Sequence, residues 1–334
     1  MKREGNLIER IAERDNLLLA FWKAARGRRA SREVVAFQRG LDARVASMAA
    51  QILAGDIPVG KFTSFPIRDP KPRQIFAPAF AERVLHHAIM NVCEPRLDRY
   101  LIADTYACRR GKGTSAALDK AQQLVRRYRF VLKLDIAGYF EHIDHVRLLA
   151  MIARLWKDRA LLALLARIVG SHAVHPGKGL PIGTLTSQHF ANLYLGALDH
   201  FCKQQLQCRG YVRYMDDFLL FADDRDVLRG WLLRLKRWLA EELQLELKVP
   251  IVAPTARGVA FLGFRVLPTR CMLTGQRKRR FARSLRTIAK AHASGAWSEE
   301  ECAVRVGSVL AHAQRARSFG WRRAVVLSLG DLSS

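Results

Sequence analysis

The stretch that most constrains this chain is Tyr-Val-Arg-Tyr-Met-Asp-Asp-Phe-Leu-Leu-Phe at residues 211–221. Two adjacent carboxylates, Asp216 and Asp217, stand between two apolar runs rich in aromatic and β-branched residues. That pattern predicts a β-hairpin with the acids at its turn. Because neighbouring strand residues point to opposite faces, the acids cannot both aim at one ligand, yet their charges crowd one place. Such crowding is unfavourable without a cation, so we favour a divalent metal over a solvated Asp-Asp turn.

A third acid lies at the end of an earlier predicted strand, residues 130–136, which presents Asp135. The intervening chain is long enough for two helices, so Asp135 can return beside the hairpin in one antiparallel sheet. Three acids together suit a pair of metal ions, one activating an attacking oxygen and one the leaving oxygen of a phosphoryl transfer. Mg²⁺ prefers carboxylates plus substrate phosphates, which fits so sparse a ligand set. We therefore expect a nucleic-acid 3′-hydroxyl to attack the α-phosphate of a bound nucleotide.

Charge points to the same class of partner. The formal net charge is +26, from 56 Lys and Arg against 30 Asp and Glu, and a nucleic acid is the expected partner of so basic a chain. A membrane partner is not expected, because no apolar run approaches the ~18–20 residues that span a bilayer. The six scattered cysteines include no C-x-x-C pair and favour a reduced, cytoplasmic protein.

Periodicity predicts a mixed helix and strand organisation. Residues 1–55 are expected to be helical, with a second helix ending at Gly55, followed by a hairpin of residues 62–67 and 73–76. The basic loop 106–115 opens a helix and forms a candidate phosphate cradle. The remaining predictions are helices over 81–92, 146–169, 186–207, 228–247 and 299–317, the last with a capping box of Ser298 and Glu301, and a hairpin over 257–266.

Three short motifs resemble a known family. Tyr-Met-Asp-Asp at 214–217, Leu-Asp-Ile-Ala-Gly-Tyr-Phe at 134–140 and Phe-Leu-Gly-Phe at 261–264 are similar to successive motifs of reverse transcriptases and occur in that family's order. The resemblance implies an α+β right-hand polymerase with fingers, a palm built on an antiparallel sheet, and a small helical thumb. It divides the chain into an N-terminal helical region, fingers and palm, and thumb, over residues 1–55, 56–270 and 271–334.

The resemblance also implies roles for the residues around the acids. Asp135 and Asp216 match the acids that bridge two Mg²⁺ ions, for which Mn²⁺ can substitute, and the Ile136 carbonyl matches a further ligand. Asp217 matches the third acid, which is more electrostatic than ligating. Phe140 falls on the steric gate that excludes a ribose 2′-hydroxyl by its bulk.

Cations elsewhere match further parts of the family's site. Arg73 matches the fingers residue that grips the incoming deoxynucleoside triphosphate, and Lys248 falls near the lysine proposed to assist pyrophosphate departure. The residues expected at the RNA template or at the DNA or RNA primer are Lys71, Arg109, Lys112 and Gly263.

A fourth motif narrows the family. Most reverse transcriptases carry Gln-Gly-x-x-x-Ser-Pro where this chain has Ile182, Gly183 and, after Ser187, Gln188, all three expected at the nucleotide. Ile for Gln and Gln for Pro is similar to the enzymes of diversity-generating retroelements. That similarity implies mutagenic retrohoming, copying errors at template adenines, and a small basic helical accessory protein. Retron, phage-defence and group II intron-like reverse transcriptases are alternatives. An idle RNA-binding protein and a metal-dependent nuclease are the alternatives from other classes.

Overall fold

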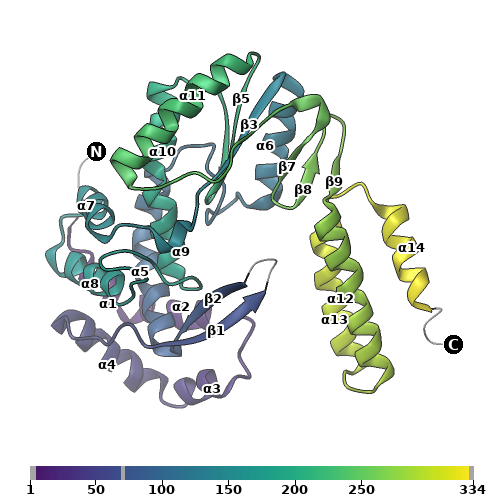
Figure 1. The fold of residues 1–334 in the computed structure, drawn as a ribbon. Coiled ribbons are helices and arrows are strands. Elements are labelled where there is room, and N and C mark those ends of the chain that lie inside the picture. Colours follow the sequence, from purple (N-terminus) through teal and green to yellow (C-terminus); the bar gives the residue numbers. More distant parts are fainter. Residues whose placement is uncertain (1–4, 69–71, 331–334) are drawn as a thin grey trace. The chain divides into compact units, whose positions relative to one another are not determined.

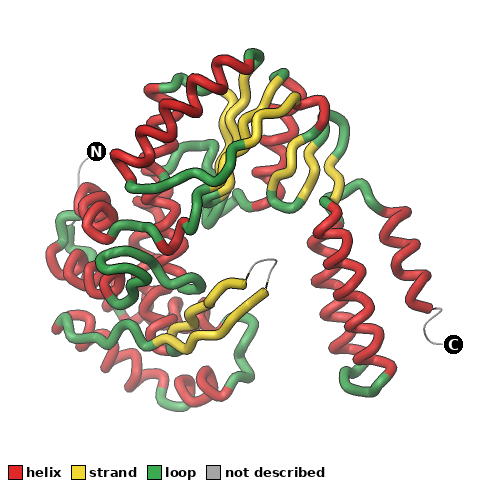
Figure 2. The backbone as a smooth tube through the Cα atoms, in the orientation of Figure 1, coloured by secondary structure: helices red, strands yellow, loops and turns green. Residues whose placement is uncertain are grey.

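The computed structural model describes residues 5–68 and 72–330, and the chain in it divides into two compact units. The first unit comprises Met1–Ala103, Ile136–Leu206 and Arg234–Leu247. The second comprises Asp104–Asp135, Gln207–Leu233 and Lys248–Ser334. Helices and antiparallel sheets are both abundant (Figures 1 and 2), which confirms the predicted α+β class. The subdomain boundaries after residues 55 and 270 stay predictions.

The first unit begins with four short helices where the sequence predicted two. Breaks fall at Glu13, whose backbone is extended, and near Gly27 and Gly40, because glycine weakens a helix. Gly55 ends the last of them, as predicted, and the structure shows it as a left-handed C-cap with φ +78°. The helices are α1 Ile8–Ala12, α2 Arg14–Ala25, α3 Arg32–Gln38 and α4 Leu41–Ala54.

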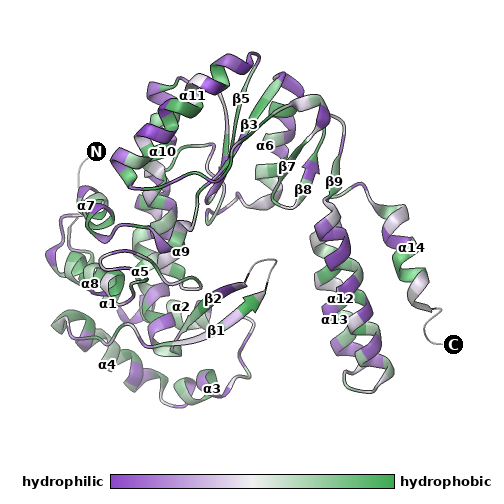
Figure 3. Ribbon diagram, in the orientation of Figure 1, coloured by the Kyte–Doolittle hydropathy of each residue, from purple (hydrophilic) through white to green (hydrophobic). Residues whose placement is uncertain are grey.

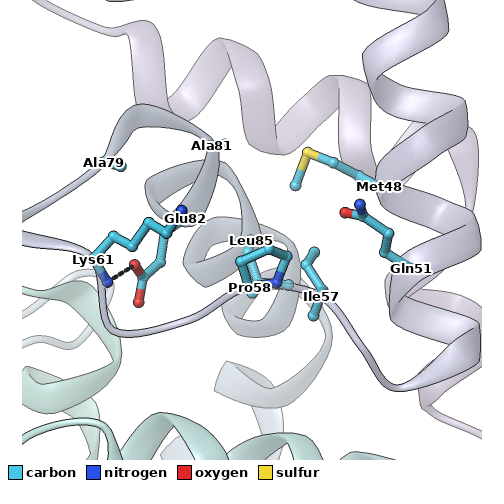
Figure 4. Close-up of a pocket in the computed structure, with 9 residues that line it drawn as sticks. All are labelled: Met48, Gln51, Ile57, Pro58, Lys61, Ala79, Ala81, Glu82 and Leu85. Atoms are coloured by element: carbon cyan, nitrogen blue, oxygen red, sulfur yellow. Dashed lines mark hydrogen bonds between the residues drawn. The ribbon is translucent and has the colours of Figure 1, made fainter.

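A β-hairpin follows, formed by β1 Phe62–Arg68 and β2 Pro72–Pro78. Its base is tied to α5 Phe80–Tyr100 by Glu82, whose carboxylate accepts hydrogen bonds from the backbone N–H groups of Gly60 (2.8 Å) and Lys61 (3.0 Å). Figure 4 shows Glu82 beside the mainly apolar pocket at this base. Burial raises the pKa of the Glu82 carboxyl while the two amides oppose that shift. Glu82 therefore fixes the chain that leads into the hairpin.

The predicted single helix over residues 146–169 is wrong. The chain forms α7 His145–Leu155 and α8 Arg159–Gly170, separated by a short non-helical link. Asp158 accepts hydrogen bonds from Leu161 N–H (3.0 Å) and Leu7 N–H (2.6 Å), so its side chain caps α8 instead of continuing a helix. The unit is completed by α9 Leu185–Tyr194 and α10 Gly196–His200, which continues as a π-helical turn, Phe201–Gln205.

The second unit is built around a four-stranded antiparallel sheet in the order β4-β5-β3-β6. α6 Thr114–Arg127 packs against this sheet through an apolar core that includes Leu118 and Leu124 from the helix, with Val131 and Phe221 from the strands. The strands are β3 Phe130–Asp135, β4 Gly210–Tyr214, β5 Asp217–Ala222 and β6 Ile251–Pro254. α11 Arg225–Trp238 follows β5 and continues as a π-helical turn to Leu243, four residues short of its predicted end.

A smaller antiparallel sheet leads into three C-terminal helices. α12 and α13 lie side by side (Figure 1), and Figure 3 shows how strongly hydrophilic α12 is. Ser298 and Glu301 form the predicted capping box, but α13 ends before residue 317. Within the described residues, no helix is long and apolar enough to cross a bilayer. The elements are β7 Val259–Phe261, β8 Phe264–Val266, β9 Cys271–Leu273, α12 Gly275–Ala293, α13 Glu299–Ala313 and α14 Phe319–Gly330.

Candidate active site

The three predicted acids converge at one end of the four-stranded sheet. In the register of β3 and β5, Asp135 lies directly opposite Asp217. The last pair of β4 and β5 joins Tyr214 to Asp217, so Met215 and Asp216 form a two-residue hairpin loop. The predictions of a hairpin with acids at its turn, and of Asp135 in the same antiparallel sheet, are both confirmed.

A lysine that the sequence reasoning missed holds one of these acids. Lys133 Nζ donates to Asp217 Oδ1 (2.9 Å) and Oδ2 (3.2 Å). It precedes Asp135 by two residues on β3, so the two side chains share one face of the sheet. Burial raises the pKa of Asp217 to about 6, against the opposing pull of Lys133 and with help from Asp135 and Asp216. The signal in the sequence was a lone cation inside an apolar strand.

A second lysine contacts Asp135. The backbone N–H of Lys248 donates to the Asp135 carbonyl oxygen (2.8 Å), and its ammonium group pairs with the Asp135 carboxylate. The Lys248 side chain is 42% exposed, so this pair is in contact with solvent. Ile136, the next residue after Asp135, buries its side chain and forms a β-bridge with Leu247. Lys248 thus contacts one of the three acids, and its role at the departing pyrophosphate stays a prediction.

The donor set at this end of the sheet fits a hard divalent cation. Asp135, Asp216 and Asp217 supply carboxylate oxygens, and Mg²⁺ ordinarily takes one or two carboxylates plus substrate phosphates. Across residues 5–68 and 72–330, no three His, Cys, Asp or Glu side chains form a self-sufficient metal site. A site completed by the substrate is the arrangement that these residues allow.

The predicted nucleotide-contacting residues of the first unit are linked by backbone hydrogen bonds. Phe140 lies half-buried in a 3₁₀ turn, Tyr139–Glu141, with its ring edge-on to Tyr139 at 5.6 Å. Its carbonyl oxygen accepts a hydrogen bond from the N–H of Leu180 (2.8 Å). This bond fixes the Phe140 turn to the loop that carries Ile182, two residues further on.

That loop lies directly against the β1–β2 hairpin. The Ile182 carbonyl oxygen accepts a hydrogen bond from the N–H of Phe76 on β2 (2.8 Å). Gly183 has φ +121°, and a Cβ there would lie 2.8 Å from the Phe76 carbonyl oxygen, so both its conformation and its neighbour require glycine. Arg73 is exposed on the same strand, and Gln188 is half-buried in the first turn of α9. The structure therefore brings Phe140, Ile182 and Gly183 into one hydrogen-bonded framework with the Arg73 strand.

Contacts within the basic loop before α6 fix two of its cationic side chains. Lys112 Nζ lies 4.8 Å from the centre of the Tyr106 ring, and Arg109 donates to the Thr105 carbonyl oxygen (3.1 Å). Both side chains are partly exposed beside the start of α6, where Thr114 meets the Tyr214 hydroxyl (3.4 Å). The loop is thus anchored near the hairpin that carries the acids.

Gly263 lies in the two-residue turn between β7 and β8. It has φ +80°, and a Cβ there would collide with the Arg277 side chain, which packs on it from α12. Its carbonyl oxygen accepts hydrogen bonds from the backbone and hydroxyl of Thr274. Gly263 therefore joins this turn to the start of α12. Lys71, the remaining predicted contact, lies outside the described residues.

A basic stripe on α12 was also missed. Its members recur at intervals of four, three and four residues, which places them on one helix face, and all are exposed. The opposite face is buried through Phe281, Leu285 and Ile288. Such a stripe suits a phosphate backbone. The α12 stripe consists of Arg279, Arg283, Arg286 and Lys290.

Comparisons with known proteins agree with these motifs. A family model described as reverse transcriptase (RNA-dependent DNA polymerase) matches residues 67–266, more than half of the chain. The group II intron-encoded protein LtrA of Lactococcus lactis subsp. cremoris is 25% identical over 140 residues. That match covers 40% of this chain and 23% of LtrA, so the chain spans only a fraction of that relative's length.

Two solved telomerase structures align with this chain. The apo telomerase of Candida tropicalis gives a TM-score of 0.51 at 12% identity, covering 75% of this chain and 57% of that one. Telomerase of Candida albicans with a TWJ fragment of telomeric RNA gives 0.48 at 14% identity, covering 76% and 54%. The first similarity confirms the predicted right-hand polymerase fold.

Proposed function

Because the chain belongs to the reverse transcriptase family, we propose that it copies an RNA template into DNA, with Asp135, Asp216 and Asp217 as its catalytic acids. The observation that carries this proposal is the register that sets Asp135 opposite Asp217, with Asp216 in the adjoining two-residue loop. A binding protein has no need to gather three carboxylates at one sheet end, since their mutual repulsion is unfavourable.

The three acids are proposed to have different roles because their surroundings differ. Asp135 and Asp216 are the proposed metal-bridging pair, and the Ile136 carbonyl is a further proposed ligand. Asp217 is held by Lys133 and contributes mainly negative potential. Two Mg²⁺ ions, or Mn²⁺ in their place, would lower the barrier by activating the primer hydroxyl and neutralising the leaving oxygen. Lys248, which contacts Asp135, is proposed to donate a proton to the departing pyrophosphate.

The hydrogen-bonded framework of the first unit is the proposed nucleotide site. Phe140 is the proposed gate against ribonucleotides, with its position fixed by the bond from Leu180. Arg73 is proposed to bind the triphosphate, since a guanidinium group matches phosphate oxygens in a bidentate manner. Gly183 allows the backbone of this loop to approach the β2 strand closely, and Gln188 is proposed to line the site from α9.

The nucleic acid is proposed to bind through the cations of the second unit. Arg109 and Lys112 flank the start of α6, Gly263 carries the turn beside α12, and the α12 stripe presents four further charges. A chain with net charge +26 should bind RNA with a steep salt dependence, because each neutralised phosphate releases counterions.

We further propose that the enzyme serves a diversity-generating retroelement and miscopies template adenines. The support is Ile182, which offers apolar surface where most relatives carry a glutamine. A small basic helical accessory protein and a cytoplasmic location belong to the same proposal, and the lack of a disulfide among the six described cysteines supports a reducing compartment. The likeness to LtrA favours a group II intron-like enzyme as the second candidate.

Primer extension on poly(rA)/oligo(dT) with dTTP and Mg²⁺ tests the central proposal. The parent should extend the primer, and Asp135→Ala, Asp216→Ala and Asp217→Ala should each lose on the order of 1,000-fold, equivalent to several kcal/mol of transition-state stabilisation. Asp226→Ala, at an exposed acid of α11 paired with Arg229, is the matched control and should keep its activity. Retention of RNA without product would identify an idle binding protein, and degradation a nuclease.

A further inference from the structure

The hairpin loop that carries Asp216 is conformationally strained. Met215, its first residue, has φ +54°, whereas Asp216 is not among the residues with positive φ. A positive φ at the first of two loop residues is the pattern of a type II′ turn, which favours glycine there. A side chain in this left-handed region is unfavourable by roughly 1–2 kcal/mol. Something outside the loop must therefore hold Met215 in place.

Arg213 supplies such a hold. Its relative exposure is 0%, and its Nη1 donates a hydrogen bond to the Met215 carbonyl oxygen (3.1 Å). Its backbone is fixed as well, since its N–H donates to the Asp104 carbonyl oxygen (3.0 Å) and its carbonyl oxygen accepts from the N–H of Tyr106 (3.0 Å). A guanidinium group is charged in proteins, so this bond is charge-assisted.

The bonded carbonyl belongs to the peptide between Met215 and Asp216. Fixing its direction fixes ψ of Met215 and φ of Asp216, the two rotations that aim the Asp216 side chain. We propose that Arg213 is a positioning residue that holds this peptide in the strained turn and so directs the Asp216 carboxylate. The inference rests on the proposed metal-binding role of Asp216.

Arg213→Met tests the inference, because methionine keeps most of the apolar stem and removes the guanidinium donor. A lost charge-assisted bond corresponds to a fall in kcat of roughly 10- to 100-fold. The KM for dTTP should stay unchanged. Half-saturation by Mn²⁺, followed by electron paramagnetic resonance with a chain-terminated primer on its template and saturating dTTP, should rise by a similar factor.

Rescue by glycine separates positioning from packing. Glycine adopts positive φ without strain, so in a Met215→Gly background the Arg213→Met change should lower kcat by less than about threefold. Arg96→Met, at another buried arginine (4% exposed) in α5, is the matched control, and its effect should be the same in both backgrounds. Should Arg213→Met alone misfold, the double variant must fold and polymerise.

Three results would overturn the inference: full activity of folded Arg213→Met, an equal loss in both backgrounds, or misfolding of the double variant. Asp216→Ala distinguishes a wrong assignment of the catalytic acids from a wrong role for Arg213. If Asp216→Ala still polymerises, the assignment of the acids fails. If Asp216→Ala is inactive and the loss from Arg213→Met is equal in both backgrounds, only the positioning role fails.

Discussion

Replacement of Lys133 by methionine should destabilise the folded protein through the acid that it leaves behind. The Lys133 and Asp217 side chains are only 21% and 20% exposed, and the ammonium group contacts both carboxylate oxygens. Methionine keeps most of the apolar stem and removes the charge. Asp217 would then be left beside Asp135 and Asp216 without the ammonium group that offsets its burial.

The size of the effect follows from this partial burial. Breaking a fully buried ion pair costs about 3–5 kcal/mol, and an exposed pair contributes about 0–1 kcal/mol. We expect Lys133→Met to lower the free energy of unfolding by about 2–3 kcal/mol at pH 8, a value between these limits. The Lys248–Asp135 pair, 42% and 34% exposed, is the internal comparison, and Lys248→Met should cost less than about 1 kcal/mol.

The loss in the free energy of unfolding caused by Lys133→Met should depend on pH in a defined direction. Burial already raises the pKa of Asp217 to about 6, above its unfolded value of 3.8, and loss of Lys133 raises it further. A carboxyl whose folded pKa is raised destabilises the protein as pH increases through the interval between its unfolded and folded pKa values. The deficit of Lys133→Met is therefore largest at pH 8 and shrinks toward pH 5, where Asp217 is protonated.

Urea unfolding of parent, Lys133→Met and Lys248→Met in EDTA, at pH 8 and pH 5, measures these differences through the midpoints and slopes. Added Mg²⁺ should raise the midpoint of Lys133→Met more than that of the parent, because a cation replaces part of the lost charge. Equal midpoints for the two lysine variants, or a deficit that grows toward pH 5, would refute the reasoning.

The remaining predictions concern the nucleotide site. Gly183→Ala forces a Cβ against the Phe76 carbonyl oxygen and should raise the KM for dTTP and lower the melting temperature. Gly27→Ala, with open space around it, should lower the melting temperature only through the strain of a side chain at φ +76°, with the KM unchanged; equal losses would contradict the contact argument. Phe140→Ala should admit ribonucleotides, and an unchanged ratio of kcat/KM for dTTP and UTP would show that the gate lies elsewhere. Ile182→Gln should raise fidelity by roughly tenfold at most, since one hydrogen bond contributes about 0.5–1.5 kcal/mol; identical error spectra in sequenced cDNA would leave Ile182 a packing residue.

The sheet and its acids could be predicted because the information is local. Strand alternation around 211–221 and 130–136 fixes which residues share a face, and a two-residue loop leaves one register for Asp216 and Asp217. The break at Asp158 could not be read in the same way. Apolar periodicity runs through it, while its carboxylate binds Leu7, a residue distant in the chain.

The partners of the two cations in the strands could not be predicted from the sequence. Lys133 and Arg213 each stand alone in an apolar strand, which marks them as buried charges in need of partners. Their partners depend on side-chain reach across the sheet and around a turn, and the raised pKa of Asp217 depends on burial. None of these follows from periodicity. The sequence therefore indicates that each cation needs a partner, and only the structure identifies that partner.

Because the loop between Tyr214 and Asp217 has only two residues, the number of residues in it constrains the site more strongly than their identity does. One inserted residue would slide β5 by one position against β3, and every β5 side chain would exchange faces. Asp217 would then stand opposite Leu134 instead of Asp135, and its carboxylate would turn into the core. Laboratory insertions, such as tags or cross-linking sites, therefore belong between α12 and α13, where Gly295 has no heavy atom within 4 Å of its Cβ position.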